Sequence, residues 1–254
     1  MLSLNHYWRI IAAGISYIVF GIGAFFPGIY IFFIALFPID AATKQRKVRN
    51  AIKYLCRFYV DFMQFLGLMS YTVTRQSTSQ KNGLLVICNH SMLIDALFVL
   101  AYVDNICCVV KDALCHNPFT RIPIRLAGYI SNSSEDFVEQ ACDKLERGEN
   151  VLIFPEGTRN FSDFQLEFRR GAANIAVMSE APVLPMVIRC IPRALGKKEP
   201  WYQLPDKKSR IIVKINPVLL IDDCIDTNLP RTLKYRRLNE YWREYYRTEI
   251  AKAT

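Results

Sequence analysis

The chain is organised around the run Leu84-Leu85-Val86-Ile87-Cys88-Asn89-His90-Ser91-Met92-Leu93-Ile94-Asp95. The apolar residues Leu84–Cys88 follow the turn residues Asn82 and Gly83, and they predict a short buried strand. The residues from Ser91 to Val103 are apolar at helical spacing and predict a helix. A histidine therefore stands where a strand ends and a helix begins, and an aspartate follows it.

The spacing of His90 and Asp95 suits a general base. Within one helix, two side chains five residues apart would point about 140° away from each other. If His90 precedes the helix and Asp95 lies inside it, the carboxylate can accept a hydrogen bond from one ring nitrogen. The other nitrogen is then left to take a proton. The alternative is an ordinary loop histidine beside an acidic residue that stabilises a helix N-terminus.

A second apolar run also ends in a polar turn. Val151–Phe154 predicts a strand, and Pro155-Glu156-Gly157-Thr158-Arg159 follows it. Thr158 and Arg159 supply a hydroxyl and a planar guanidinium, which suit a phosphate or a carboxylate. Glu156 can hold Arg159 or a substrate hydroxyl. The alternative is an ordinary surface turn with an ion pair between residues i and i+3.

Together, the Asn-His-x4-Asp and Phe-Pro-Glu-Gly-Thr-Arg motifs resemble those of the glycerolipid acyltransferase family, whose best-known members are the 1-acylglycerol-3-phosphate acyltransferases. Weaker matches lie at Arg125–Ile130, Phe168–Gly171 and Ala181–Val187. The resemblance covers roughly Val73 to Leu220. It implies an O-acyltransferase embedded in or bound to a membrane.

The resemblance also implies roles for the residues of the two motifs. His90 would take the proton of an acceptor hydroxyl while the oxygen attacks an acyl thioester, and Asp95 would orient His90. The residues that would bind substrate are Glu156, Gly157, Thr158 and Arg159, with Lys111 as a further anion contact. For Lys111, a solvated surface residue is the alternative. The acyl donor would be acyl-CoA or acyl carrier protein, and no metal or other cofactor is implied.

The chain departs from the family pattern in the second block. The family continues as Gly-x-Ile-x-Ile-Asp-Arg and uses the arginine to hold the acceptor's phosphate, whereas Gly128–Ile130 here runs into Ser131–Ser134. We expect a lysophospholipid acceptor such as 1-acylglycerol-3-phosphate. The missing arginine keeps a less charged lipid or a specialised metabolite open as the acceptor. A catalytically silent, membrane-binding relative is the remaining alternative.

Composition narrows the class of protein. The chain of 254 residues can hold one domain and a membrane segment, and 52% hydrophobic residues exclude a disordered chain. The net charge of +9 favours anionic partners. Among these the family resemblance implies membrane lipids and an acyl donor, not nucleic acid. The 8 cysteines include no Cys-x-x-Cys pair, which argues against zinc and against a disulfide framework. The oligomeric state stays open.

The segment from Ile10 to Ile39 contains no charged residue. Helical throughout, it would be about 45 Å long, more than the roughly 30 Å hydrocarbon core, and Pro27-Gly28 should interrupt it. A tilted membrane span and a helical hairpin within one leaflet are both compatible with this pattern. The run is too long for a secretory signal peptide. Positive charge follows it at Lys44, Arg46, Lys47 and Arg49, which predicts a catalytic domain on the cytoplasmic side of the cytoplasmic membrane.

The next segment, from Arg46 to Leu68, is amphipathic. Its basic stripe consists of Arg46, Arg49, Lys53 and Arg57, and an apolar, aromatic-rich face lies beside it. Such a helix suits the interface of an anionic bilayer. The compatible alternative is a helix packed against the domain, with the basic stripe as its solvated face.

Strands and helices alternate in the rest of the chain, which predicts an α/β fold with a largely parallel central sheet flanked by helices. We place an N-terminal membrane-associated helical segment at residues 1–72 and the α/β acyltransferase domain at residues 73–254. The predicted strands are Leu84–Cys88, Ile106–Val110, Val151–Phe154, Val183–Cys190 and Arg210–Ile215. The predicted helices are Ser91–Val103, Pro118–Ala127, Glu135–Glu146, Arg170–Ser179 and Arg231–Ile250.

Overall fold

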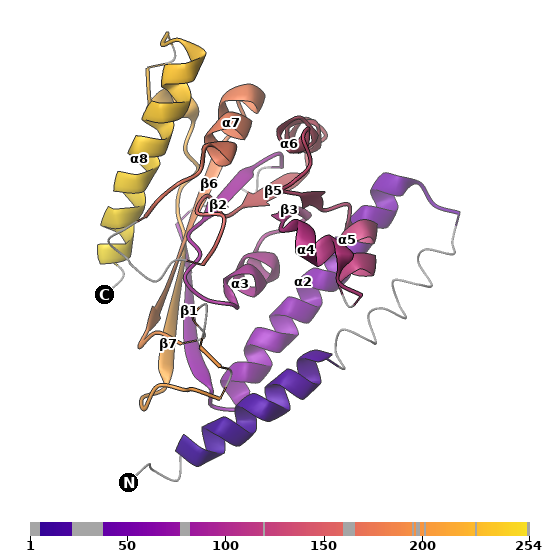
Figure 1. The fold of residues 1–254 in the computed structure, drawn as a ribbon, viewed down its shortest axis with the longest axis vertical. Helices are drawn as coiled ribbons and strands as arrows, with labels where there is room; N and C mark the ends of the chain where they lie inside the picture. The colour runs from indigo at the N-terminus through magenta and orange to yellow at the C-terminus, as the bar shows by residue number, and fades with distance from the viewer. Residues whose placement is uncertain are drawn as a thin grey trace.

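The computed structural model describes residues 6–21, 38–76, 82–118, 120–159, 166–194, 196, 199–200, 202–226 and 228–252. Its strands form one sheet in the order β1-β7-β6-β2-β5-β3-β4 (Figure 1). The strands are β1 (Met69–Arg75), β2 (Leu85–Cys88), β3 (Ile106–Val110), β4 (Ile130–Ser131), β5 (Asn150–Ile153), β6 (Val183–Ile191) and β7 (Ser209–Ile215). The helices are α2 (Ala41–Phe65), α3 (Asp95–Tyr102), α4 (Asp112–His116), α5 (Arg121–Ala127), α6 (Phe137–Glu146), α7 (Arg170–Ser179) and α8 (Arg231–Ala251). A short 3-10 helix spans Ile221–Asp223, and residues 6–21 form a further helix.

The predicted fold class of an α/β domain with a largely parallel sheet is confirmed. β6, β2, β5, β3 and β4 run parallel to one another, whereas β7 is antiparallel to β6 and parallel to β1. The sequence pattern did not predict β1 or β4. β1 pairs along its whole length with β7, from Met69 opposite Ser209 to Arg75 opposite Ile215. It therefore lies across the predicted boundary between residues 72 and 73, and its first residues belong to the sheet.

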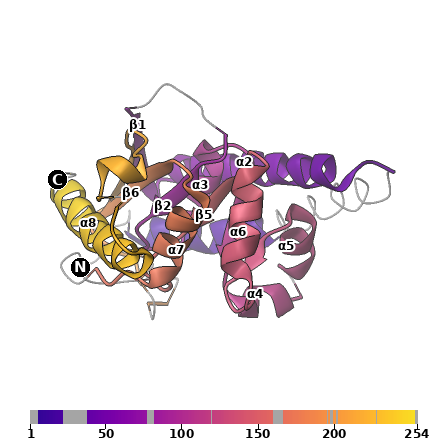
Figure 2. The same ribbon diagram turned by 90° about the horizontal axis from the view of Figure 1, so that it is seen from above.

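Helices cover both faces of the sheet (Figure 2). α2 and α3 pack on one face around Val60, Met63 and Phe98, whereas α6, α7 and α8 pack on the other. All four residues of β2 and all four of β5 are buried, since a strand covered on both faces has no solvated side. Two apolar layers thus hold the central strands, and polar side chains gather where these strands end.

The helix of residues 6–21 lies antiparallel beside the second half of α2 (Figure 1). The Trp8 indole Nε1–H donates to the Leu66 carbonyl at 3.1 Å, and the Ser16 and Tyr59 hydroxyl oxygens are 2.7 Å apart. Of the predicted uncharged run, residues 22–37 with Pro27-Gly28 lie outside the described residues. Within the described ranges, we find no helix with the length and apolar character needed to cross a bilayer.

The basic stripe of α2 does not form an open cationic face. Arg49 is buried, and its Nη1 lies 2.5 Å from Glu149 Oε2, while Lys53 pairs with Asp104 of the domain. Arg57 pairs along the helix with Asp61 at 3.0 Å. The helix is packed against the domain, as the alternative expected, but Arg49 and Lys53 of the stripe pair with the domain and do not belong to a solvated face. The exposed side chains of α2 include instead the large apolar residues Tyr54, Phe58 and Phe65.

Candidate active site

The end of β2 is fastened to β6 through a side chain. The Asn89 amide Nδ2 donates to the Ile188 carbonyl at 2.8 Å, and the Ile188 amide donates to Asn89 Oδ1 at 2.8 Å. The buried asparagine thus makes the pair of hydrogen bonds that a strand residue would make with its backbone. The backbone leaves the sheet at this point, and His90 is the first residue of the turn that follows.

Asp95 reaches back across this turn as the spacing predicted. Its Oδ2 accepts hydrogen bonds from His90 Nδ1 at 3.0 Å and from the backbone amides of Ser91 and Met92, each at 2.6 Å. The helix predicted from Ser91 begins only at Asp95. Residues 91–94 form a turn, which brings the carboxylate under the imidazole.

The protonation of the pair follows from these contacts. Asp95 is fully buried, and this burial raises the pKa of its carboxyl, while the hydrogen bond from His90 opposes the shift. Because the backbone amides of Ser91 and Met92 donate to Oδ2, this oxygen acts as an acceptor, and the tautomer that completes the third contact carries its hydrogen on His90 Nδ1. The His90 Nε2 lone pair is then available to take a proton, as in other carboxylate–histidine pairs.

The two predicted motifs meet at the same edge of the sheet. Ile87 of β2 is paired with Ile153 of β5, so the residues that follow these strands lie level with each other. The Phe154 ring stacks on the His90 ring with centroids 4.4 Å apart, and Glu156 Oε1 accepts a hydrogen bond from the His90 backbone amide at 2.9 Å. Glu156 therefore joins the two turns, and its expected contact with Arg159 or a substrate hydroxyl stays a prediction.

Gly157 allows an arginine to cross the second turn. Its φ is +68°, and a Cβ at this position would lie 2.8 Å from Nε of Arg169. The Arg169 amide also donates to the Pro155 carbonyl at 2.7 Å. The exposed Arg169 thus becomes a cation of the site that was not predicted. Its only signal in the sequence was the weak match of Phe168–Gly171 to a family block.

The other predicted binding residues lie around the same edge. Thr158 is half-buried in the turn, and Arg159 Nη1 donates to the Gly196 carbonyl at 3.2 Å. Burial raises the pKa of the Tyr17 hydroxyl, and the nearby Arg159 guanidinium opposes that shift. Lys111 is exposed where β3 ends, and because Cys108 pairs with Leu152, it lies level with Pro155. In the sheet, β5 with the second turn lies next to β2 and His90, and β3 with Lys111 lies one strand further away.

The second block surrounds a carboxylate where the family pattern has an arginine. Ser131 Oγ donates to Asp112 Oδ1 at 2.9 Å, and His116 Nε2 lies 3.3 Å from Asp112 Oδ2. The Asp112 amide donates to Asn132 Oδ1 at 3.2 Å. The hydrogen bond from Ser131 is the main cause that lowers the pKa of Asp112. This carboxylate is therefore ionised near neutral pH.

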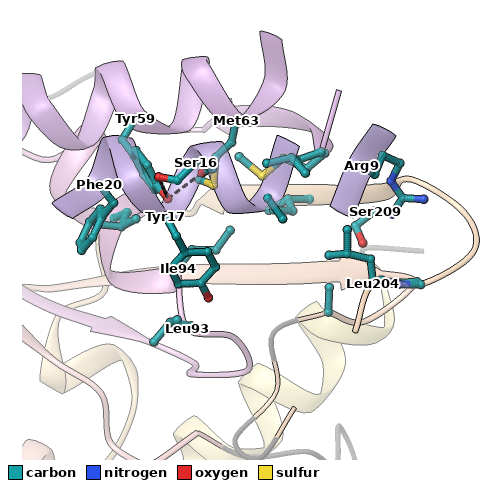
Figure 3. A pocket seen from close by; sticks show the side chains of 17 residues that line it. Arg9, Ser16, Tyr17, Phe20, Tyr59, Met63, Leu93, Ile94, Leu204 and Ser209 are labelled. Atoms are coloured by element: carbon teal, nitrogen blue, oxygen red, sulfur yellow. Dashed lines mark hydrogen bonds between the residues drawn. The ribbon is translucent and has the colours of Figure 1, made fainter. Parts of the chain in front are cut away.

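An apolar cavity of ≈ 200 Å³ opens beside the histidine turn (Figure 3). Leu93 and Ile94, which lie between His90 and Asp95 in the chain, form one end of the lining together with Tyr17 and Phe20 of the N-terminal helix. Arg9 and Ser209 lie toward the other end, as Figure 3 shows. Three parts of the chain that are distant in sequence thus enclose an apolar space next to the proposed base.

A histidine held by a buried carboxylate, beside an apolar cavity and a turn with arginines, defines a site for acyl transfer to a hydroxyl. Residues 70–189 match the family model described as "Acyltransferase". The chain is 26% identical over 82% of its length to 1-acyl-sn-glycerol-3-phosphate acyltransferase alpha of Mus musculus, covering 74% of that protein. It is 30% identical over 49% of its length to the 1-acyl-sn-glycerol-3-phosphate acyltransferase of Helicobacter pylori (strain J99), covering 56% of that protein. The protein is therefore an O-acyltransferase.

Its fold agrees with this assignment. A crystal structure of the 1-acyl-sn-glycerophosphate acyltransferase PlsC from Thermotoga maritima superposes with a TM-score of 0.75, at 19% identity, over 99% of this chain and 97% of that one. The predicted resemblance is confirmed, and residues 70–189 form the domain that matches the acyltransferase family model. Among the described residues, no three His, Cys, Asp or Glu side chains group as metal ligands would. The absence of a metal or other cofactor stays a prediction.

Proposed function

We propose that the protein transfers a fatty acyl group from an acyl thioester to the free hydroxyl of 1-acylglycerol-3-phosphate. The observation that carries this proposal is the His90–Asp95 pair, whose geometry leaves Nε2 of the imidazole as a base beside an apolar cavity. The relatives that are named 1-acyl-sn-glycerol-3-phosphate acyltransferases support this choice of acceptor.

The chain's own residues supply the proton transfers. His90 Nε2 takes the proton of the acceptor hydroxyl while the hydroxyl oxygen forms a bond to the thioester carbonyl carbon. The carbon–sulfur bond then breaks, and the imidazolium returns the proton to the departing thiolate. Asp95 stabilises the imidazolium between these steps through the 3.0 Å contact with Nδ1. No covalent acyl-enzyme is required, and no Gly-x-Ser-x-Gly nucleophile motif occurs in the sequence.

Two arginines of the second turn would bind the acceptor's phosphate. A phosphate monoester carries nearly two negative charges at neutral pH. Arg169 lies across Gly157, and Arg159 extends from the same turn. Their guanidinium groups can each bind two oxygens. Arg169 thus compensates for the arginine missing from the second block, and Lys111 adds positive charge at the same edge.

The apolar cavity beside Leu93 and Ile94 would bind an acyl chain. Its lining is almost entirely apolar, and it begins at the turn that carries His90. The thioester would then lie beside the imidazole while the chain extends below the N-terminal helix. The donor is acyl-CoA or acyl carrier protein.

The N-terminal helix and α2 would attach the protein to the membrane. Large apolar side chains are exposed along both helices, at Tyr7, Trp8, Ile11 and Ile18 and at Tyr54, Phe58 and Phe65. Soluble proteins rarely expose contiguous apolar surface of this kind unless it binds something. An amphipathic helix pair lying in the bilayer interface would bury it. Arg46 and Lys47, both exposed, favour the cytoplasmic leaflet.

The experiment is a turnover assay of the purified protein with labelled acyl-CoA and acyl carrier protein against a panel of lysolipids. We expect lysophosphatidate to be acylated with the highest kcat/KM. Arg169→Gln should then raise KM for lysophosphatidate about tenfold, the effect of about 1.4 kcal/mol in binding. The control is Arg147→Gln, an exposed arginine at the end of α6. The absence of turnover with every acceptor would reject the proposal.

A less charged acceptor is the second candidate, and Asp112 favours it. This ionised carboxylate lies level with Glu156 by strand register and would repel a phosphate dianion. The Asp112 carboxylate could instead accept a hydrogen bond from a lysolipid whose headgroup carries hydroxyls or a positive charge. Higher kcat/KM for such a lysolipid than for lysophosphatidate in the same assay would select this candidate.

A further inference from the structure

A second, polar groove lies on the opposite face of the sheet from α2. It encloses ≈ 630 Å³ between α7 and α8, which run side by side in both views (Figures 1 and 2). The start of α7 contributes Arg170 and Asn174, and the first half of α8 contributes Arg236, Asn239 and Arg243. None of these residues takes part in the acyl-transfer chemistry described above.

The groove carries an excess of positive charge. Three arginines line it, and the only carboxylate among its lining residues is Glu240, which Arg236 contacts at 3.0 Å and Arg237 at 3.2 Å. Neither Arg170 nor Arg243 forms an ion pair with any residue in the described part of the chain. Counting one carboxylate against the three lining arginines leaves a net charge of +2.

Two side-chain amides lie in the groove without hydrogen bonds. Asn239 is 8% exposed, and its Oδ1 is buried with no partner among the described residues; the same is true of Asn174 Oδ1. Both oxygens are acceptors and a phosphate only accepts hydrogen bonds, so these two side chains can bind a phosphate through their Nδ2 groups alone. A carboxamide presents both a donor and an acceptor, and either end can face a ligand.

We propose that this groove binds the 3′-phosphate of a coenzyme A thioester donor. The inference rests on the proposed function. A phosphate monoester carries nearly two negative charges, which matches the net charge of the groove, and its oxygens accept hydrogen bonds from arginine and asparagine. The groove also begins close to the acyl-transfer site. Phe168 lines it and directly precedes Arg169, which crosses the turn at Gly157.

The test compares two ligands that differ in one group. Calorimetry on the full-length protein in detergent measures the dissociation constants of coenzyme A and dephospho-coenzyme A, which lacks the 3′-phosphate. We expect coenzyme A to bind at least tenfold more tightly, and inorganic phosphate to compete with it. In the double variant Arg170→Gln/Arg243→Gln, coenzyme A should bind as weakly as dephospho-coenzyme A. Arg247→Gln is the control, since it removes one charge a turn further along α8, where Arg247 lies 3.7 Å from Glu244.

Two further variants keep the result unambiguous. Arg170→Lys/Arg243→Lys retains the charge and should retain a salt-sensitive preference for coenzyme A. If the Gln variant lost this preference only because it misfolds, its circular dichroism spectrum would also change. His90→Ala should abolish turnover and keep the preference, which separates the groove from the chemistry. Equal binding of the two ligands by the wild-type protein, or an equal loss of the preference in Arg247→Gln, would overturn the proposal even if acyl transfer is measured.

Discussion

Asp95 has opposing effects on the stability of the fold and on the proposed catalysis. Its burial raises the pKa of the carboxyl above the ordinary value of 3.8. A raised folded-state pKa means that the stability contributed by this group is fully present below pH 3.8 and is lost as the pH rises through the folded-state pKa. Catalysis, in contrast, needs the ionised carboxylate beside the imidazolium. The residue therefore lowers the stability of the fold at the pH at which it is needed.

We expect Asp95→Asn to be more stable than the wild-type protein at pH 7 and to lose this advantage below pH 3.8, where the carboxyl is protonated in both states. Activity should fall by roughly 10²–10⁴, because an amide neither fixes the imidazole tautomer nor stabilises its charge. Urea unfolding at the two pH values and a turnover assay measure both effects. A variant less stable than wild type at pH 7 would contradict this account of Asp95.

The base itself is tested by His90→Ala. We expect the acyl-transfer rate to fall by roughly 10²–10⁴ while the fold stays intact, which is the usual range for a positioned acid or base. His116→Ala is the control, because this exposed histidine of α4 pairs with Asp112 and does not contact the His90 turn. If folded His90→Ala retained wild-type turnover, His90 would not be the base.

At the scale of elements, α2 is attached to the domain by a buried ion network. Arg49 Nε donates to the Ala127 carbonyl at 2.8 Å, and Nη1 contacts both Glu149 and the side chain of Asn105. Lys144 Nζ lies 3.4 Å from the other carboxylate oxygen of Glu149. Through Arg49, the network joins α2 to the ends of α5 and α6.

Arg49→Ala should destabilise the protein by about 3 kcal/mol, because it leaves Glu149 buried without its main partner. The remaining contact with Lys144 keeps the loss at the lower end of the range for broken buried pairs. Arg46→Ala, three residues earlier on the exposed side of α2, should change the free energy of unfolding by less than about 0.5 kcal/mol. Chemical unfolding of both variants measures the difference. Equal values would show that the network contributes nothing specific.

At the scale of the whole molecule, the two faces of the sheet present different surfaces. The face covered by α2 and the N-terminal helix exposes apolar side chains, and the face covered by α7 and α8 carries the cationic groove. In the two proposals, the acyl chain of the donor lies on the first face, and the 3′-phosphate of its coenzyme A lies on the second. The catalytic edge lies at the ends of the strands between these two helical layers.

Ile11→Ser/Ile18→Ser should reduce binding to vesicles that contain anionic lipid by at least about tenfold, since each isoleucine buried in the bilayer contributes roughly 1.5–3 kcal/mol. These side chains are 58% and 63% exposed on the N-terminal helix. Leu233→Ser, an exposed apolar residue of α8 on the other face, is the matched control. Flotation of the purified proteins with vesicles measures the bound fraction. Unchanged binding of the double variant would exclude this helix from the membrane contact.

Local patterns in the sequence determined the strand–turn units of the site. The runs before His90 and Glu156 are short, apolar and bounded by turn residues, and such patterns depend on neighbours in the chain. The alternation of strands with helices was likewise enough to predict a parallel sheet, in which the ends of β2 and β5 meet. The spacing allowed His90 to pair with Asp95 once the histidine was placed before the helix, and the second motif favoured this pairing over an ordinary loop histidine.

Only the tertiary structure decided which distant residues complete the site. Arg169 crosses Gly157, β1 pairs with β7 from more than a hundred residues away, and Arg49 turns into the domain to meet Glu149. None of these contacts leaves a periodic signal, because each depends on the packing of separate elements. The start of α3 is a further case. The amides of Ser91 and Met92 donate to the Asp95 carboxylate, so the helix begins after the turn. Hydrophobic spacing does not reveal this start.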